Sequence, residues 1–429
     1  MKKTCNSAIL TILLFFLATD IIFPQRESIF PSRPVTLSQY LVNVMKGNLG
    51  YIAEQFNVSI AAAELKAARV FPDPEISLAY SNNEDQKLQM GQSFEAGMSY
   101  PISFGNKRGA NVSLAKSQLE LSQMILDTYF QNLRAEAALN YFSGLRSKKI
   151  YLLQKEIGEQ LTRLAITDSI RFSAGEASEI DALQSSLEAR SQFSEVYQSF
   201  AEMQNALINL TRLEGKKFND TINDPVGDFP FKHRDFNLDD LLINAVRNRA
   251  DLMVAVKNKE VSDKYLNLLK ANRAFEFSLE AGYSYNSIVK NEIAPAPAYN
   301  GLSAGLAIPL KFSNLNKGSV ESAELAIRQS QTFYEETESQ IISEVMQAYN
   351  DFIAQNKKLE HYNLGLIEDA GKILQGRIYS YQHGESGLID VLNARRTYTE
   401  LRLNYIEALF DYSTALIELE RASGIWDLP

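Results

Sequence analysis

The sequence is poor in the residues that enzymes and metal sites usually need. Its 429 residues include one cysteine, Cys5, and three histidines. The histidines, His233, His361 and His383, stand alone, without the His-x-x-x-His or Glu-x-x-His spacing of a helical metal site. No phosphate-binding loop or dinucleotide-binding fingerprint occurs. We therefore expect no catalytic residue, no cofactor and no resident metal, and we reject an enzyme.

Long apolar runs are also missing, apart from one short run at the start of the chain. Lys2 and Lys3 precede the apolar segment 8–18, which has the length of a secretory signal and is too short for a membrane helix of roughly 20 residues. We expect residues 1–25 to be a signal peptide; the alternative is a buried N-terminal helix. Cys5 would leave with the signal, so the mature chain would carry no thiol.

Positive charge is in deficit as well. The formal net charge is −9, which makes nucleic acid an improbable partner. With the expected signal peptide, we expect an exported, acidic chain. Because no other segment is apolar enough for a membrane helix, any entry into a membrane must use β-strands.

What the sequence does contain is an internal duplication. Segment 37–65 aligns with segment 238–266 at an offset of 201, and later matches lie 208 to 209 residues apart. Both copies end on a glycine, Gly215 and Gly424. Offsets that drift only by small loop changes indicate two copies of one unit. We expect a first repeat at 35–220, a linker at 221–237 and a second repeat at 238–427.

Proline is absent from two long stretches, 102–224 and 310–428, which are rich in good helix formers. Proline in a helix interior costs about 3 kcal/mol, so its absence over such a length favours long helices. Apolar residues in both stretches step by three and four, as in coiled-coil seams. The seam residues are Phe193, Val196, Phe200, Met203, Leu207 and Leu210, then Tyr398, Leu401, Tyr405, Ala408, Tyr412, Ala415 and Leu419.

Between the helices the apolar period changes to two. Four segments alternate in this way and predict strands at about 74–83, 91–103, 275–286 and 299–311, one hairpin in each repeat. Their length suits strands that cross a bilayer at a tilt. An ordinary antiparallel sheet with one face on a soluble core would alternate in the same way.

Four strands cannot close a barrel, and open sheet edges are not tolerated in lipid. Copies of the chain must therefore pool their strands. Two copies would give eight strands and a barrel filled by side chains, whereas three would give twelve and leave room for a passage. A conducting barrel therefore favours a trimer.

The layout of helix, hairpin and long helices, twice over, resembles the TolC-type outer membrane efflux family along about 35–427. The most specific match is the family's helix-tip motif, which reads RFSAGEASEIDAL at 171–183 and YSYQHGESGLIDVL at 379–392. The resemblance implies mostly α structure with membrane β: long antiparallel coiled-coil helices and two β-hairpins per chain, assembled as a homotrimer with a twelve-strand barrel and a periplasmic α-helical tunnel. It also implies an outer membrane location in a Gram-negative-type bacterium, contact with outer membrane lipid, and docking to a periplasmic membrane-fusion adaptor and an inner-membrane pump of the RND or ABC type.

The tip motif has a structural reading of its own. A glycine between two helices permits the positive φ of a tight reversal, and a following Ser or Asp caps the returning helix. We expect these capping roles for Ser178 with Asp181, and for Ser386 with Asp390. The tip residues expected to dock an adaptor or pump are Gly175, Glu176, Ser178, Gly384 and Glu385.

Functional roles at the tip follow from symmetry and from the resemblance. Three copies of Asp390 around a narrow tunnel end would form an acidic, cation-favouring ring. The resemblance implies a second acidic ring three residues on, where this chain has Asn393. It also implies that bonds between the hairpins tie the tunnel shut, with Tyr381 facing Asp181. The family's arginine position is Ser386 here, which predicts a looser tie.

The cargo is less constrained. Segment 100–108, YPISFGNKR, looks like a turn of the heavy-metal (Czc-type) branch of the family, which points to metal cations; drugs are the other cargo considered. We expect a passive exit duct of a tripartite efflux pump. The alternatives are the outer membrane channel of a type I protein secretion system, and a periplasmic coiled-coil adaptor or structural protein.

Overall fold

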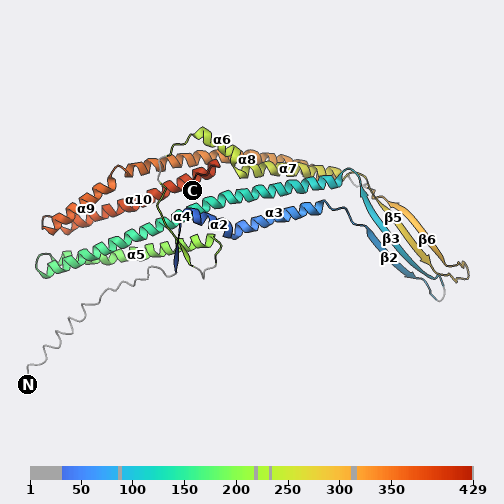
Figure 1. The fold of residues 1–429 in the computed structure, drawn as a ribbon, viewed down its shortest axis with the longest axis horizontal. Helices are drawn as coiled ribbons and strands as arrows, with labels where there is room; N and C mark the ends of the chain where they lie inside the picture. Colours follow the sequence, from blue (N-terminus) through green and yellow to red (C-terminus); the bar gives the residue numbers. More distant parts are fainter. Residues whose placement is uncertain (1–30, 86–88, 217–220, 231–233, 311–315, 428–429) are drawn as a thin grey trace, which may run out of the picture.

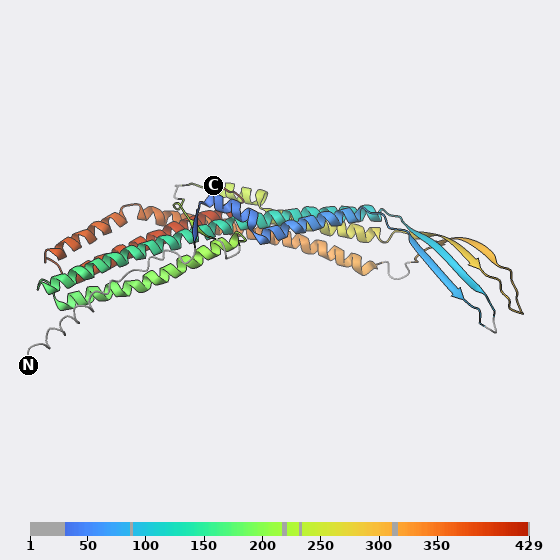
Figure 2. The same ribbon diagram turned by 60° about the horizontal axis from the view of Figure 1, so that its bottom comes forward.

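The computed structural model describes residues 31–85, 89–216, 221–230, 234–310 and 316–427. The expected signal peptide, 1–25, lies outside these ranges. Helical hairpins form one end of an elongated molecule and a β-sheet forms the other (Figures 1 and 2). The fold is mostly helical and contains the four long strands that the sequence predicted.

The two repeats contain matching elements. The first comprises α2 (Leu37–Gly47), α3 (Leu49–Ala68), β2 (Glu75–Asn82), β3 (Gln92–Ser103), α4 (Lys107–Ser173) and α5 (Glu179–Leu213). The second comprises α6 (Leu238–Asn248), α7 (Ala250–Ala271), β5 (Glu276–Asn286), β6 (Tyr299–Ala307), α8 (Lys317–Tyr362), α9 (Leu366–Gln382) and α10 (Leu388–Ser423). With 67 residues, α4 extends about 100 Å at 1.5 Å per residue.

The long helix of the second repeat is broken where α4 is continuous. Helix α8 ends at Tyr362, and Gly365 starts α9 with a φ of +94°, a conformation that glycine adopts without strain. The heptad pattern did not predict this break. It separates α9 from the long helix α8, so that α9 and α10 form a hairpin of their own.

The four strands form one antiparallel sheet in the order β2-β3-β5-β6. Their ends agree with the expected ranges to within two residues, except that β6 ends at Ala307, four residues before the expected 311. Strands β2 and β6 are the edges and have no further partner strand in the part of the chain that the structure describes. The hairpins of the two repeats thus join into a single sheet with two open edges.

The two faces of the sheet differ in chemistry. Register places Ser77, Gly97, Gly282 and Ser303 in one row across all four strands. The adjacent row, on the other face, consists of Leu78, Ala96, Tyr283 and Leu302. Leu302 is 89% exposed in the single chain, so the apolar face has no cover within it.

The sequence also contains a Gly-x-Ser-x-Gly string, at 301–305, that resembles the nucleophile motif of α/β-hydrolases. It lies inside β6 and pairs with β5 along its length. A hydrolase nucleophile needs a sharp strand-to-helix turn, so this string is a sheet segment of small residues.

The expected linker, 221–237, contains an unpredicted strand. Strand β4 (Ile222–Pro225) pairs in parallel with β1 (Ser32–Val35), which precedes the first repeat. The hydroxyl of Tyr141 on α4 donates to the carbonyls of Val35 and Val226, at 3.0 and 2.6 Å. These bonds attach the small sheet to the middle of the helical region.

The main core lies at this same level, where α2, α4, α6, α8 and α10 meet. Tyr40, Phe352 and Tyr412 are almost completely buried there, and the Tyr40 hydroxyl donates to the Leu210 carbonyl at 2.9 Å. From this core the α4–α5 and α9–α10 hairpins extend away from the sheet (Figure 1). Their tips therefore lie at the end opposite the strands.

Candidate functional site

Both hairpins reverse at the glycines that the tip motif predicted. Gly175 joins α4 to α5 with a φ of +80°, and Gly384 joins α9 to α10 with a φ of +75°. No heavy atom lies within 4 Å of a Cβ built on either glycine, so only the backbone conformation requires glycine there. Glu176 and Glu385, one residue further on, are exposed at the two tips.

The capping prediction is correct for the first hairpin. Ser178 is the N-cap of α5: its Oγ accepts from the Asp181 backbone N–H at 3.1 Å. The same hydroxyl donates to the Asp181 carboxylate at 2.7 Å. The carboxylate of Asp181 therefore bonds within its own helix end.

The capping prediction is wrong for the second hairpin. Helix α10 begins one residue later than expected, with Gly387 as its N-cap and no side-chain cap bond. The Ser386 Oγ is buried without a hydrogen-bond partner in the described part of the chain. In both hairpins the N-cap comes three residues after the turn glycine, so the cap position of the second hairpin is Gly387 and Ser386 lies one residue too early to cap the helix.

Tyr381 is bonded to an aspartate that the sequence did not single out. Its hydroxyl donates to Oδ1 of Asp168 at 2.8 Å, a contact between the end of α9 and the last turns of α4. The expected pairing with Asp181 is therefore wrong in this structure, because Asp181 bonds to Ser178 while Asp168, which is fully buried, points toward Tyr381. We name the Tyr381–Asp168 hydrogen bond the tip contact.

Tyr381 is buried against apolar side chains at the tip contact. Tyr381 is 7% exposed and packs with Leu388 and Val391 of α10. Burial, and then the hydrogen bond to Asp168, raise the pKa of the Tyr381 hydroxyl above its usual value. The second carboxylate oxygen of Asp168 has no hydrogen-bond partner among the described residues, which leaves Tyr381 as the group that compensates its burial.

Asp168 was missed although the sequence carries a signal for it. Ile157, Leu161, Leu164 and Asp168 step by four, three and four along the inward side of α4, so that an aspartate occupies a seam position. A charged residue at such a position needs a partner. The pattern indicates that a partner is needed but does not identify it as Tyr381, 213 residues away.

Asp390 and Asn393 lie in the first turns of α10, near the tip. They are three residues apart and so share one side of the helix. Asp390 is partly exposed and Asn393 is exposed. One chain does not test whether they form rings, so that role stays a prediction.

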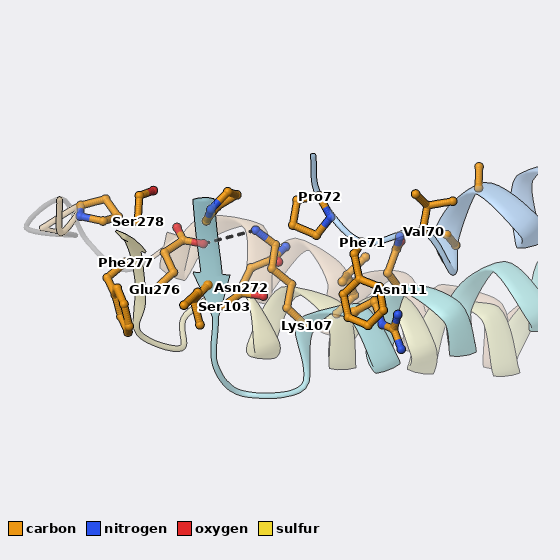
Figure 3. Close-up of a pocket in the computed structure, with 17 residues that line it drawn as sticks. Val70, Phe71, Pro72, Ser103, Lys107, Asn111, Asn272, Glu276, Phe277 and Ser278 are labelled. Carbon is orange, nitrogen blue, oxygen red and sulfur yellow. Dashed lines mark hydrogen bonds and ion pairs between the residues drawn. The ribbon is translucent and has the colours of Figure 1, made fainter. Parts of the chain in front are cut away.

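A cavity of about 750 Å³ lies where the helices join the sheet (Figure 3). Lys107, at the start of α4, lies 3.5 Å from the Glu276 carboxylate at the start of β5. The guanidinium of Arg108 lies 3.8 Å from the centre of the Phe71 ring and donates to the Arg69 carbonyl. The Lys107–Glu276 pair joins the two repeats at the junction of helices and strands, and the Arg108 contacts hold α4 to the segment after α3 within the first repeat.

The described ranges contain no group of three or more His, Cys, Asp or Glu side chains placed to hold a metal ion. None of the helices in those ranges combines the length and apolar character needed to cross a bilayer.

Comparison with known proteins agrees with this geometry. Residues 52–216 and 241–425 match the family described as outer membrane efflux protein. The chain is 24% identical over 388 residues to the cobalt-zinc-cadmium resistance protein CzcC of Cupriavidus metallidurans, covering 86% of this chain and 87% of that protein. It is 21% identical over 395 residues to the outer membrane protein TolC of Vibrio cholerae, covering 87% and 86%. The fold superposes on the Campylobacter jejuni CmeC outer membrane channel with a TM-score of 0.75 at 16% identity, covering 90% of this chain and 85% of that one.

Proposed function

Because this chain belongs to the outer membrane efflux protein family and is an outer membrane efflux channel, we propose that the tips of its α4–α5 and α9–α10 hairpins form the periplasmic gate. The observation that carries this proposal is the tip contact, which joins the second repeat to the first at the end opposite the sheet. A channel with its strands in the membrane meets its cargo at that far end.

The open edges of the sheet support a trimer. Unpaired N–H and C=O groups on β2 and β6 would each cost several kcal/mol in lipid. If β6 of one copy pairs with β2 of the next, three copies close a twelve-strand barrel wide enough to conduct. The exposed row that includes Leu302 then faces lipid, and the row that includes Gly282 faces the lumen.

In the proposed closed state, the tip contact holds α9 and α10 against α4. Breaking it removes the hydrogen bond of a buried carboxylate, which favours separation of the hairpins and a wider tunnel end. Asp390 of three copies would give the aperture an acidic lining, with Asn393 as a neutral second ring.

The test is ion conductance of the purified channel in planar bilayers. We expect Tyr381→Phe to raise single-channel conductance, because the ring remains and the hydroxyl is lost. The matched control is Tyr379→Phe, two residues earlier on the same helix and 60% exposed. An equal conductance of Tyr381→Phe and Tyr379→Phe would remove the tip contact from the gate.

Channels of this family work with a periplasmic adaptor and an inner-membrane pump. We place the docking surface at the two exposed turns, around Gly175, Glu176, Ser178, Gly384 and Glu385. Glu176→Lys with Glu385→Lys should then reduce co-purification of the cognate adaptor without changing conductance. Unchanged co-purification would place docking elsewhere.

For the cargo, the observation is the likeness to CzcC, which is named for resistance to cobalt, zinc and cadmium. We propose divalent metal cations, admitted by the acidic aperture rather than bound at a site within one chain. Deleting the gene should lower resistance to cobalt, zinc and cadmium. Normal metal resistance with impaired drug export or protein secretion would contradict this assignment and leave the channel itself unaffected.

A further inference from the structure

A cavity of about 500 Å³ lies beside the tip contact and is lined by residues of α4, α9 and α10. These helices run together toward the tips in both views (Figures 1 and 2). Arg163 and Arg171 of α4, Tyr381 of α9 and Arg395 of α10 are among its lining residues. Three arginines thus line one cavity next to the proposed gate.

Arg395 is the most enclosed of the three. It is only 8% exposed, its Nη1 donates to Gln160 Oε1 at 2.6 Å, and its Nε has no hydrogen-bond partner among the described residues. Burial, and then the nearby Arg163, lower the pKa of Arg395 below its usual value. A buried guanidinium that bonds only to a neutral amide lacks the counter-charge that such groups normally have.

The other charges around the cavity do not supply this counter-charge. Glu156 is the only carboxylate among the described residues that line it, and Arg402 binds it through two bonds of 3.0 Å each. Glu156 also accepts from Gln160 at 3.0 Å. Asp168, just outside the cavity, accepts from Tyr381.

Arg171 also has a buried guanidinium nitrogen without a hydrogen-bond acceptor among the described residues. Its guanidinium lies 4.9 Å from the centre of the Tyr381 ring, and its Nη1 is buried without a hydrogen-bond partner in the described part of the chain. Arg171 and Arg395, which line the same cavity, therefore each carry one buried nitrogen without a hydrogen-bond partner in the described part of the chain. A negative group in the cavity would supply an acceptor for such nitrogens and would offset the repulsion that Arg163 exerts on Arg395.

We propose that this cavity binds a small oxyanion, of the carboxylate, sulfate or phosphate class, between Arg163, Arg171 and Arg395. Guanidinium groups match the planar or tetrahedral oxygens of such anions through paired N–H donors. A bound oxyanion would link α4 to α10 next to the tip contact and hold the hairpins together. Binding itself does not depend on the proposed gate, whereas an effect on conductance does.

The binding test uses the full-length protein purified in detergent, with inorganic phosphate, sulfate or succinate added at constant ionic strength against chloride. We expect a saturable rise in Tm with at least one of these anions. Arg163→Gln and Arg395→Gln should each weaken the apparent affinity about tenfold. The matched control is Arg396→Gln, which removes the same charge one residue further along α10 from an exposed position and should behave like the wild type.

Three results would overturn the proposal. The first is the absence of a saturable rise in Tm with any anion. The second is an equal rise in Tm in the wild type and in all three variants. The third is a loss of apparent affinity in Arg396→Gln equal to that in Arg395→Gln. Arg163 is exposed enough for its substitution to leave folding intact, so Arg163→Gln decides the matter if Arg395→Gln does not fold. Anion binding without any change in conductance would keep the site and remove its link to the gate.

Discussion

The hydroxyl of Tyr381 donates to Oδ1 of Asp168 at 2.8 Å, across 213 residues of sequence and between the two repeats of the chain. Both side chains are buried, and the carboxylate has its other oxygen unpartnered in the described structure. The bond to Tyr381 is therefore the hydrogen bond that the buried carboxyl group of Asp168 makes within the described structure.

The first prediction concerns the strength of this bond. Tyr381→Phe should destabilise the purified protein by about 1.5–3 kcal/mol, the usual range for a hydrogen bond to a charged group. Asp168→Asn keeps a hydrogen-bond acceptor and should therefore lower the free energy of unfolding by less. In thermal unfolding of both single variants and the double variant, the losses should be non-additive, whereas additive losses would mean that the two side chains do not interact.

The second prediction compares two serines at equivalent turns. Ser178 caps α5, so Ser178→Ala should cost about 1 kcal/mol. Ser386 is buried without a partner, so Ser386→Ala should be neutral or slightly stabilising. Thermal unfolding of the two variants tests this directly. A larger loss for Ser386→Ala would show that its hydroxyl has a partner in the assembled channel.

The third prediction concerns pH. The pKa of Tyr381 is raised by burial and by its bond to Asp168, so its hydroxyl keeps its proton in the folded protein above the usual tyrosine pKa of about 10. The stabilisation is therefore complete below about pH 10 and is lost as the pH rises beyond that value. The ratio of Tyr381→Phe to wild-type conductance should be the same at pH 6 and pH 9. A ratio that approaches one at pH 9 would show that another group controls the contact.

The fourth prediction concerns selectivity. If Asp390 lines the aperture in three copies, Asp390→Asn should lower the preference for cations, and Asn393→Asp should raise it. Reversal potentials in asymmetric salt measure both. Glu400→Gln is the control, because Glu400 is an exposed carboxylate further along the same helix. Equal reversal potentials for Asp390→Asn and Glu400→Gln would exclude an acidic ring at Asp390.

Much of the fold could be predicted because its signals are local and repeated. Alternation located β3 and β5 to within one residue, and the glycines of the tip motif located both reversals. The oligomer was inferred from the need to satisfy strand edges together with the family resemblance, and the pairing of β3 with β5 was not predicted. The small sheet of β1 and β4 was missed because strands of four residues are too short to show a period.

The site was harder to predict because its contacts join distant segments. The family resemblance implied a bond from Tyr381 to the first hairpin, and the structure has such a bond but to Asp168 and not to Asp181, since spacing along one hairpin does not indicate which residue of α4 it meets. The break before α9 and the arginine cavity were not predicted either. The break lies at Gly365, which the heptad pattern did not single out, and the cavity depends on how α4, α9 and α10 come together, which no local pattern indicates.

The most direct test of the account is a reversible replacement of the tip contact. In a variant with Asp168→Cys and Tyr381→Cys, a bifunctional methanethiosulfonate can bridge the two thiols, and a reductant removes the bridge; the chain's own Cys5 lies in the expected signal peptide. We predict high conductance in planar bilayers for the reduced protein and low, wild-type-like conductance for the bridged protein, with single-cysteine variants insensitive to the reagent. Equal conductance of the bridged and reduced protein would contradict a gate held closed between α9 and α4.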